Sequence, residues 1–256
     1  MIDIKFTING LKTGNDSLDF SAENEISKFY RKLVDRLNAL NIKRPQNVKE
    51  KYPNIDFPEA VEVKILMIDN NKIFQEYFDD ESAKKTLGLF NLTNSKQILG
   101  KTNMPDEFIV LIEADINNFN RLYNQYASYL DITKEELLSR YLVTLTHEIC
   151  HAVEFIENSG GLTPFKVEEL FEADLFGHDV DSCATGHGHL KYAKDYLGVD
   201  REDDDVVTDI MEDRVESKGI MLYQKLNITT ADLSDVLSSS STKSTAKIKS
   251  KSKFKT

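Results

Sequence analysis

The sequence predicts an α+β fold in which a small mixed β-sheet from the N-terminal half packs on one long helix, followed by a mainly helical C-terminal half. Runs of β-branched and aromatic residues recur in the first half, whereas apolar residues at three- and four-residue steps dominate from residue 132 onward. Of the 256 residues, 40% are hydrophobic and 29% are charged, which is enough apolar material for one core. We therefore expect a single domain over residues 1–237.

The first predicted elements are a strand and a helix. Residues 2–8 read IDIKFTI, which is typical of an opening strand. A helix is expected over residues 22–40, with Ser21 as its N-cap. Its apolar face is formed by residues at helical spacing, namely Ile26, Phe29, Leu33, Leu37 and Leu40. This face is expected to lie in the core.

Two further segments have the composition of buried strands. They are residues 61–68 (VEVKILMI) and residues 108–113 (FIVLIE). A weaker extended stretch lies between them, at residues 88–99. Together with the opening strand, these segments predict a small mixed sheet.

The longest predicted helix begins at a capping box and ends at two glycines. Thr133 and Glu136 have the spacing of a capping box. A broad apolar face follows and continues to the Gly160-Gly161 pair, which stops the helix. Further helices are expected at residues 163–175, 189–197, 204–225 and 230–237.

Cysteine content and hydropathy exclude several classes of protein. The two cysteines, Cys150 and Cys183, cannot form a disulfide framework and indicate a reducing compartment. The most apolar run, residues 108–112, is far shorter than the ~20 residues of a membrane-spanning helix. The first residues lack the charge and apolar block of a signal peptide. We therefore expect a soluble, cytoplasmic protein.

Charge is distributed unevenly along the chain. Residues 238–256 consist mainly of Ser, Thr and Lys, with six lysines and no acid, and are predicted to form a disordered basic tail. Because the whole chain has a formal net charge of −11, residues 1–237 carry −17. This acidic body is expected to repel nucleic acid. The tail suits an acidic partner.

The long predicted helix contains His147-Glu148-Ile149-Cys150-His151, which fits the pattern H-E-x-x-H. Residues four apart share a helix face, so both imidazoles can reach one cation with Glu148 beside them. The alternative is a pair of core histidines bonded to carboxylates, which is costly for two imidazoles on one face. Imidazole and carboxylate ligands favour zinc, and a catalytic zinc site uses three protein ligands.

This motif, followed by a predicted helix with the sequence Leu170-Phe171-Glu172-Ala173, resembles the zincin metallopeptidases, and most of all their gluzincin branch. The metzincin pattern is absent, because Glu157 stands where its third histidine would be. In gluzincins a glutamate on the following helix is the third zinc ligand. The resemblance therefore implies a zincin-like fold with His147, His151 and Glu172 as metal ligands.

Helix geometry also favours Glu172. The motif helix continues about seven residues past His151, and an antiparallel helix that starts at Pro164 regains that level after about the same length. Glu172 is the carboxylate nearest this point. The alternatives, ranked behind it, are Glu168 and Glu169, then Asp174, His178 and, farther downstream at helical spacing, Glu212 and Glu216.

The resemblance implies a zinc-dependent peptidase that acts on a peptide or protein. Zinc would lower the pKa of a bound water, and Glu148 would take its proton as general base and later protonate the leaving amine. The stretch at residues 88–99 could be the edge strand to which zincins pair an extended peptide. The alternative is a structural or assembly protein that keeps a zincin-like fold, with or without proteolysis. An acidic body with a basic tail suits such docking, for example onto the components of a virus particle. A viral protein of this kind is expected in the host cytoplasm or in the virus particle.

Overall fold

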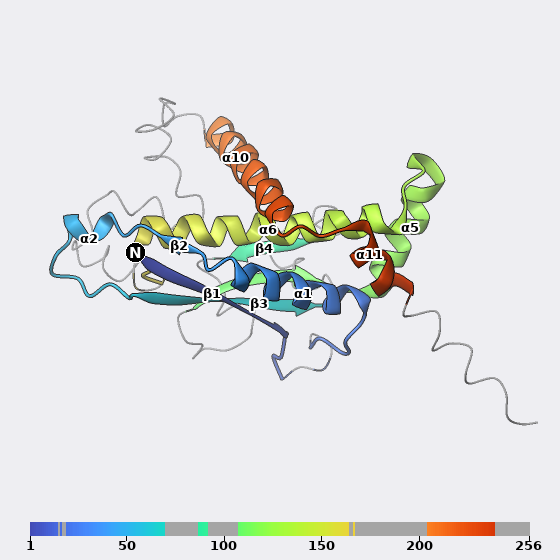
Figure 1. Cartoon of the computed structure of the whole chain (residues 1–256), viewed down its shortest axis with the longest axis horizontal. Helices are drawn as coiled ribbons and strands as arrows, with labels where there is room; N and C mark the ends of the chain where they lie inside the picture. Colours follow the sequence, from blue (N-terminus) through green and yellow to red (C-terminus); the bar gives the residue numbers. More distant parts are fainter. Residues whose placement is uncertain are drawn as a thin grey trace, which may run out of the picture.

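The described residues form a mixed five-stranded sheet with helices packed on it (Figure 1). The computed structural model describes residues 1–14, 16, 19–69, 87–91, 107–163, 166 and 204–238. The strands are β1 (Ile2–Gly10), β2 (Lys43–Arg44), β3 (Ala60–Ile68), β4 (Gly88–Asn91) and β5 (Phe108–Glu113). The helices are α1 (Glu25–Ala39), α2 (Val48–Lys51), α5 (Ile116–Leu130), α6 (Lys134–Ser159), α10 (Asp204–Lys225) and α11 (Thr230–Ser238).

The sheet has the strand order β2-β1-β3-β5-β4. Strands β1, β3 and β5 are parallel, while the short strands β2 and β4 pair antiparallel at the two edges. Phe6 pairs with Val63, and Val63 pairs with Phe108, so the alternating apolar residues of three strands form rows on one face. The predicted small mixed sheet is confirmed.

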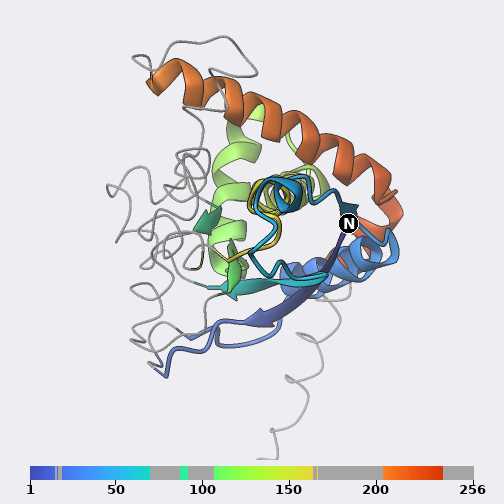
Figure 2. The ribbon, with the colours of Figure 1, turned by 90° about the vertical axis from the view of Figure 1, so that its left-hand side faces the viewer.

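One core joins this face of the sheet to α1 and α6. More than half of the residues of α6 are buried, and the helix contacts both β4 and β5. On the side of α6 away from the sheet lies α10, which crosses it at an angle (Figures 1 and 2). Helix α6 is therefore enclosed between the sheet and α10, which places the H-E-x-x-H motif between two layers.

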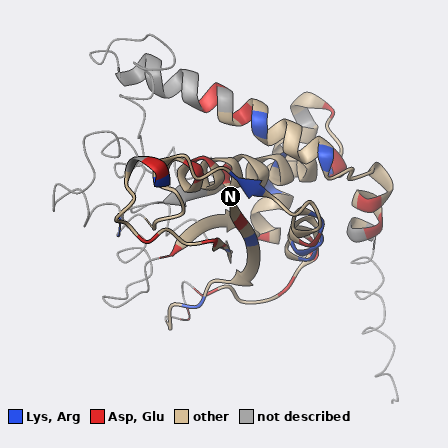
Figure 3. Cartoon of the chain, turned by 60° about the vertical axis from the view of Figure 1, so that its left-hand side comes forward, with Lys and Arg blue, Asp and Glu red and all other residues tan. Residues whose placement is uncertain are grey.

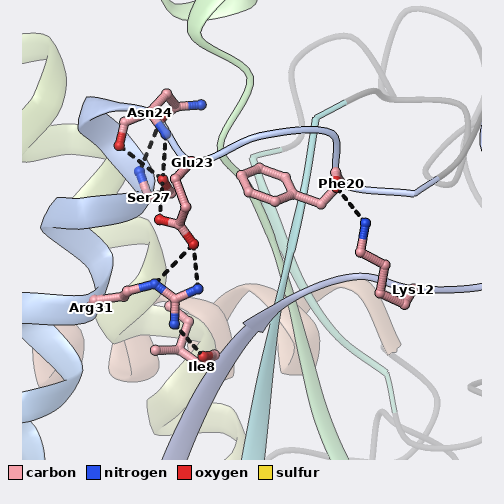
Figure 4. Close-up of polar contacts among 7 residues, drawn as sticks. All are labelled: Ile8, Lys12, Phe20, Glu23, Asn24, Ser27 and Arg31. Atoms are coloured by element: carbon pink, nitrogen blue, oxygen red, sulfur yellow. Dashed lines mark hydrogen bonds and ion pairs between the residues drawn. The ribbon is translucent and has the colours of Figure 1, made fainter. Parts of the chain in front are cut away.

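The start of α1 differs from the prediction. Its N-cap is Asn24 rather than Ser21, because the Asn24 side chain accepts hydrogen bonds from the backbone of Ile26 and of Ser27. Figure 4 shows the contacts between Asn24 and Ser27. Ser21 instead hydrogen-bonds to Asp69. The predicted apolar face of α1 is buried up to Leu37, whereas Leu40, the C-cap, is 41% exposed.

Polar contacts fix α1 and the preceding segment on β1 (Figure 4). Arg31 forms an ion pair with Glu23 and donates a hydrogen bond to the carbonyl of Ile8. Lys12, just beyond β1, donates to the carbonyl of Phe20 at 2.8 Å. These contacts place the N-terminal end of α1 beside the C-terminal end of β1.

The ends of α6 agree with the prediction. Thr133 and Glu136 form the capping box, with each side chain bonded to the other's backbone. Gly160 closes the helix in the left-handed region at φ 67°, followed by Gly161 at φ 89°. The predicted strands and the helices at 204–225 and 230–237 are also confirmed, the last two as α10 and α11.

Helix α5 was not anticipated from the sequence. It is capped by Asp115, whose side chain accepts from the backbone of Asn117, and it ends at Asp131 in the left-handed conformation. The helices expected at 163–175 and 189–197, residues 92–99 and the basic tail after Ser238 lie outside the described residues. Among the described helices, none combines the length and apolar character needed to cross a membrane.

Candidate metal centre

Helix α6 presents His147 and His151 side by side. The two Nε2 atoms are 3.0 Å apart, and the ring centroids are 4.7 Å apart with the rings at 78°. This arrangement follows from helix geometry, because residues four apart lie on one face. Both side chains are largely buried, with exposed fractions of 19% and 21%.

A carboxylate from a distant part of the chain completes the group. Glu212 of α10 places Oε2 at 3.2 Å from His147 Nε2 and Oε1 at 3.5 Å from His151 Nε2. Its side chain is 47% exposed, so the carboxylate lies between the imidazoles and the solvent. All three residues offer a ligand atom within 4.8 Å of the others.

These separations suit a tetrahedral cation. Zinc binds histidine nitrogen and carboxylate oxygen at about 2.0–2.1 Å, so neighbouring ligand atoms in a tetrahedral site are about 3.3 Å apart. The observed separations of 3.0, 3.2 and 3.5 Å lie around that value. The His147, His151 and Glu212 group could therefore hold a metal ion without rearrangement of the two helices.

Glu148 directly follows His147 on α6 and is buried. Edge strand β4 passes directly over it, since a Cβ atom built on Gly88 would stand 2.8 Å from Glu148 Cγ. The same atom would be 3.1 Å from Thr144 Cγ2. Only a glycine allows the strand this close to α6, so the start of β4 lies against the side chain of Glu148.

Acidic side chains close to the two imidazoles determine the direction of the pKa shifts in this group. Burial would lower the pKa of His147, but the hydrogen bond to Glu212 and the charges of Glu148, Glu212 and Glu216 outweigh it and raise the pKa. Hydrogen bonds from His147 and His151 hold the pKa of Glu212 well below its usual range. Figure 3 shows red positions before blue ones along the coloured part of α10. In the sequence, Glu212, Asp213 and Glu216 flank Arg214 and come before Lys218, so this part of α10 carries net negative charge.

Cys150 does not belong to the group. It lines a separate cavity of about 320 Å³ between α6 and α10, together with Leu222 and Lys218. Burial raises the pKa of its thiol to about 11. The donors that converge on the candidate site within the described chain are therefore nitrogen and oxygen, which is a zinc-compatible set without thiolate.

The structure brings together part of the predicted site. His147 and His151 converge as expected, and Glu148 follows the first histidine on the same helix. Glu172, the predicted third ligand, lies outside the described residues, as do Glu168, Glu169, Asp174 and His178. Among the described residues, the carboxylate that lies near both histidines is Glu212. From the sequence, Glu212 was predicted to be a less favoured ligand than Glu172, Glu168 and Glu169.

Comparisons of the chain with protein-family models, with curated proteins and with solved structures found no match. The fold and the geometry of the candidate metal centre are therefore the basis for a functional assignment.

Proposed function

We propose that this chain is a zinc-dependent metallopeptidase whose ion is held by His147, His151 and Glu212. The observation that carries the proposal is the convergence of a carboxylate from α10 on the two histidines of an H-E-x-x-H helix. Three nitrogen and oxygen donors leave one position of a tetrahedral zinc ion for water, as a catalytic site requires. Glu172 remains the alternative third ligand.

Glu148 is the proposed general base. It follows a ligand histidine directly, is buried, and is near enough for its charge to raise the pKa of His147. A bound zinc ion in such a site lowers the pKa of its water and polarises a carbonyl group. The Glu148 carboxylate would accept the water proton and later deliver it to the departing amine.

Strand β4 supports a peptide as the substrate class. It is the terminal strand in the described sheet and runs antiparallel to β5. An extended peptide that pairs with such an edge gains backbone hydrogen bonds along its length. Because Gly88 lies against Glu148, a peptide paired with β4 would lead toward the general base.

The test is to compare wild-type protein with Glu148→Gln for zinc content and for cleavage of a peptide library. We expect about one zinc per chain in both proteins and at least about a 100-fold loss of cleavage in the variant, because the base is removed and the ligands stay. His147→Ala, which removes a ligand, is the matched comparison and should lose the zinc as well. Equal cleavage by wild type and Glu148→Gln would contradict the role of Glu148.

The same experiment addresses the structural alternative. An assembly protein that keeps a zincin-like fold would bind zinc in wild type and in Glu148→Gln but would cleave no peptide in either form. In that case the ion would have a structural role only, holding α10 against α6. Absence of zinc from the wild-type protein under saturating zinc would contradict both assignments and favour core histidines.

A further inference from the structure

The backbones of α6 and α10 are in close contact at Gly219, which lies against the ligand histidine His147. Gly219 of α10 is buried. A Cβ atom built on it would lie 2.9 Å from the Cα atom of His147 and 3.0 Å from its backbone nitrogen, whereas ordinary contacts begin at 3.4 Å. The two helix backbones therefore touch at Gly219 with no side chain between them.

The helix that can yield at this contact is α10. His147 lies near the middle of a 26-residue helix, between Thr146 and Ile149, which are fully buried. The atoms met by the new Cβ are backbone atoms, which cannot rotate away as a flexible side chain would. A methyl group at position 219 would therefore displace α10 outward by at least about 0.5 Å.

A displacement at Gly219 reaches Glu212 because both lie on one face of the same helix. They are seven residues apart, which is about two turns and about 10 Å along the axis. Val215 between them is also buried on this side. Metal–ligand distances vary by only about 0.2 Å, so a shift of this size is large for a ligand carboxylate.

Two polar contacts limit how α10 can turn about its own axis. Lys218 forms an ion pair with Glu154 of α6. One turn farther on, the Tyr223 hydroxyl is 3.3 Å from Ser139 Oγ, also on α6. With the rotation of α10 fixed in this way, the packing at residue 219 decides how deeply the helix lies on α6.

We propose that Gly219 is a positioning residue for the zinc site, because its lack of a side chain lets α10 lie deep enough for Glu212 to reach the ion. This inference rests on the proposed zinc site with Glu212 as its third ligand. Glycine is less favourable than alanine inside a helix. If space were free, an alanine at position 219 would strengthen α10 and leave the site intact.

The test is zinc affinity of the full chain carrying Gly219→Ala, measured by competition with a chelator. We expect the affinity to fall about 10- to 100-fold, as for other changes that misplace a metal ligand. The matched control is Ser217→Ala, an exposed position of the same helix, which should keep wild-type affinity. Unchanged affinity in Gly219→Ala would overturn the inference.

A double-mutant cycle separates positioning from a general loss of packing. If Gly219 acts through Glu212, Gly219→Ala should have no further effect on zinc affinity once Glu212→Ala is present. An equal loss of affinity in both backgrounds would show that the methyl group damages the site by another route. That result would overturn the positioning role.

A second variant covers the case in which Gly219→Ala does not fold. Lys218→Ala removes the ion pair that holds α10 at the crossing and should weaken zinc binding about two- to fivefold. Lys225→Ala, at the exposed end of the helix, is its control and should have no effect. Unchanged affinity in Lys218→Ala would then overturn the inference.

The two proposals fail in different ways. A wild-type chain that binds no zinc would contradict the metal centre and this inference together. Equal zinc binding by wild type and Gly219→Ala would contradict the role of Gly219 and leave the metal centre standing.

Discussion

Glu113 and Glu212 are both carboxylates near α6, but their surroundings are opposite. Glu113, at the end of β5, is fully buried, and burial raises its pKa to about 7 although Asn118 donates a hydrogen bond to its Oε1. Glu212 is half exposed, and hydrogen bonds from two imidazoles hold its pKa low. The same functional group is thus favoured as a neutral acid in one place and as an anion in the other.

Among the described residues, Glu113, unlike Glu212, belongs to no group of side chains that could hold a metal ion. The charge of Asp115 raises its pKa further, and Arg121 only partly offsets this effect. Within the described part of the chain, Glu113 Oε2 has no hydrogen-bond partner, and neither does the buried hydroxyl of Tyr141 from α6. Tyr30 of α1 donates to the backbone carbonyl of Glu113 and not to its carboxylate. A carboxylate alone among such groups lacks the converging donors that Glu212 meets.

Of the variants that test this difference between Glu212 and Glu113, we expect the largest effect, on zinc affinity, from Glu212→Ala. Loss of a ligand should lower zinc affinity by more than about 100-fold, above the range seen when only the orientation of a ligand is disturbed. Glu216→Ala removes the same charge one turn away and should stay close to wild-type affinity. Zinc retained by Glu212→Ala would shift the third ligand to Glu172, which can be checked by the corresponding alanine variant.

A smaller effect is expected from pH. The carboxyl group of Glu113 has a pKa of 4.5 in the unfolded chain and about 7 in the folded protein, so the folded state holds the proton more tightly. The stability due to Glu113 is complete below pH 4.5 and is lost as the pH rises through 7. Between pH 6 and pH 8 the loss should be about 1 kcal/mol.

Glu113→Gln is the matched variant for this pH effect. Its side chain cannot ionise but still offers an oxygen to Asn118, so its unfolding free energy should decline less between pH 6 and pH 8 than that of wild type. Chemical denaturation at several pH values measures the difference. Parallel curves for the two proteins would show that Glu113 does not change its protonation state over this range.

The smallest effect concerns two tyrosines near Glu113. Tyr30→Phe removes a hydroxyl that donates to the Glu113 carbonyl at 2.9 Å and should cost about 1 kcal/mol of stability. Tyr141→Phe removes a buried hydroxyl that has no partner among the described residues and should be close to neutral. Thermal melts of both variants check this contrast. An equal loss in Tyr141→Phe would mean that its hydroxyl is bonded, for instance through water to Glu113.

Local signals were sufficient to predict the elements that carry the histidines. The capping box at Thr133, the two glycines after Ser159 and the apolar runs of β3 and β5 all act within a few residues. Helix α5 was missed because three asparagines interrupt its first turns, and asparagine favours caps and turns over helix interiors. The cap of α1 moved by three residues because Ser21 and Asn24 are both good N-caps, and the bond from Ser21 to Asp69 depends on the folded sheet.

The role of Glu212 could not be read from local pattern. Its acidic neighbours Asp213 and Glu216 give the same signal in the sequence, and all three lie at exposed positions of α10. What distinguishes Glu212 is the crossing of α10 over α6, which depends on the backbone contact between Gly219 and His147. A buried glycine inside a helix is the sequence feature that would have pointed to such a crossing.

The distance along the chain between the histidines and Glu212 also bears on the entropy of the site. Glu212 comes 61 positions after His151, and closing a loop of that length in the unfolded chain costs on the order of 3–4 kcal/mol. Contacts of α10 with α6, including the Lys218 to Glu154 ion pair, already close this loop. When a cation binds, folding has therefore already brought the segments that carry its three donors together. The binding free energy of the cation is therefore not reduced by the entropic cost of bringing Glu212 to the histidines.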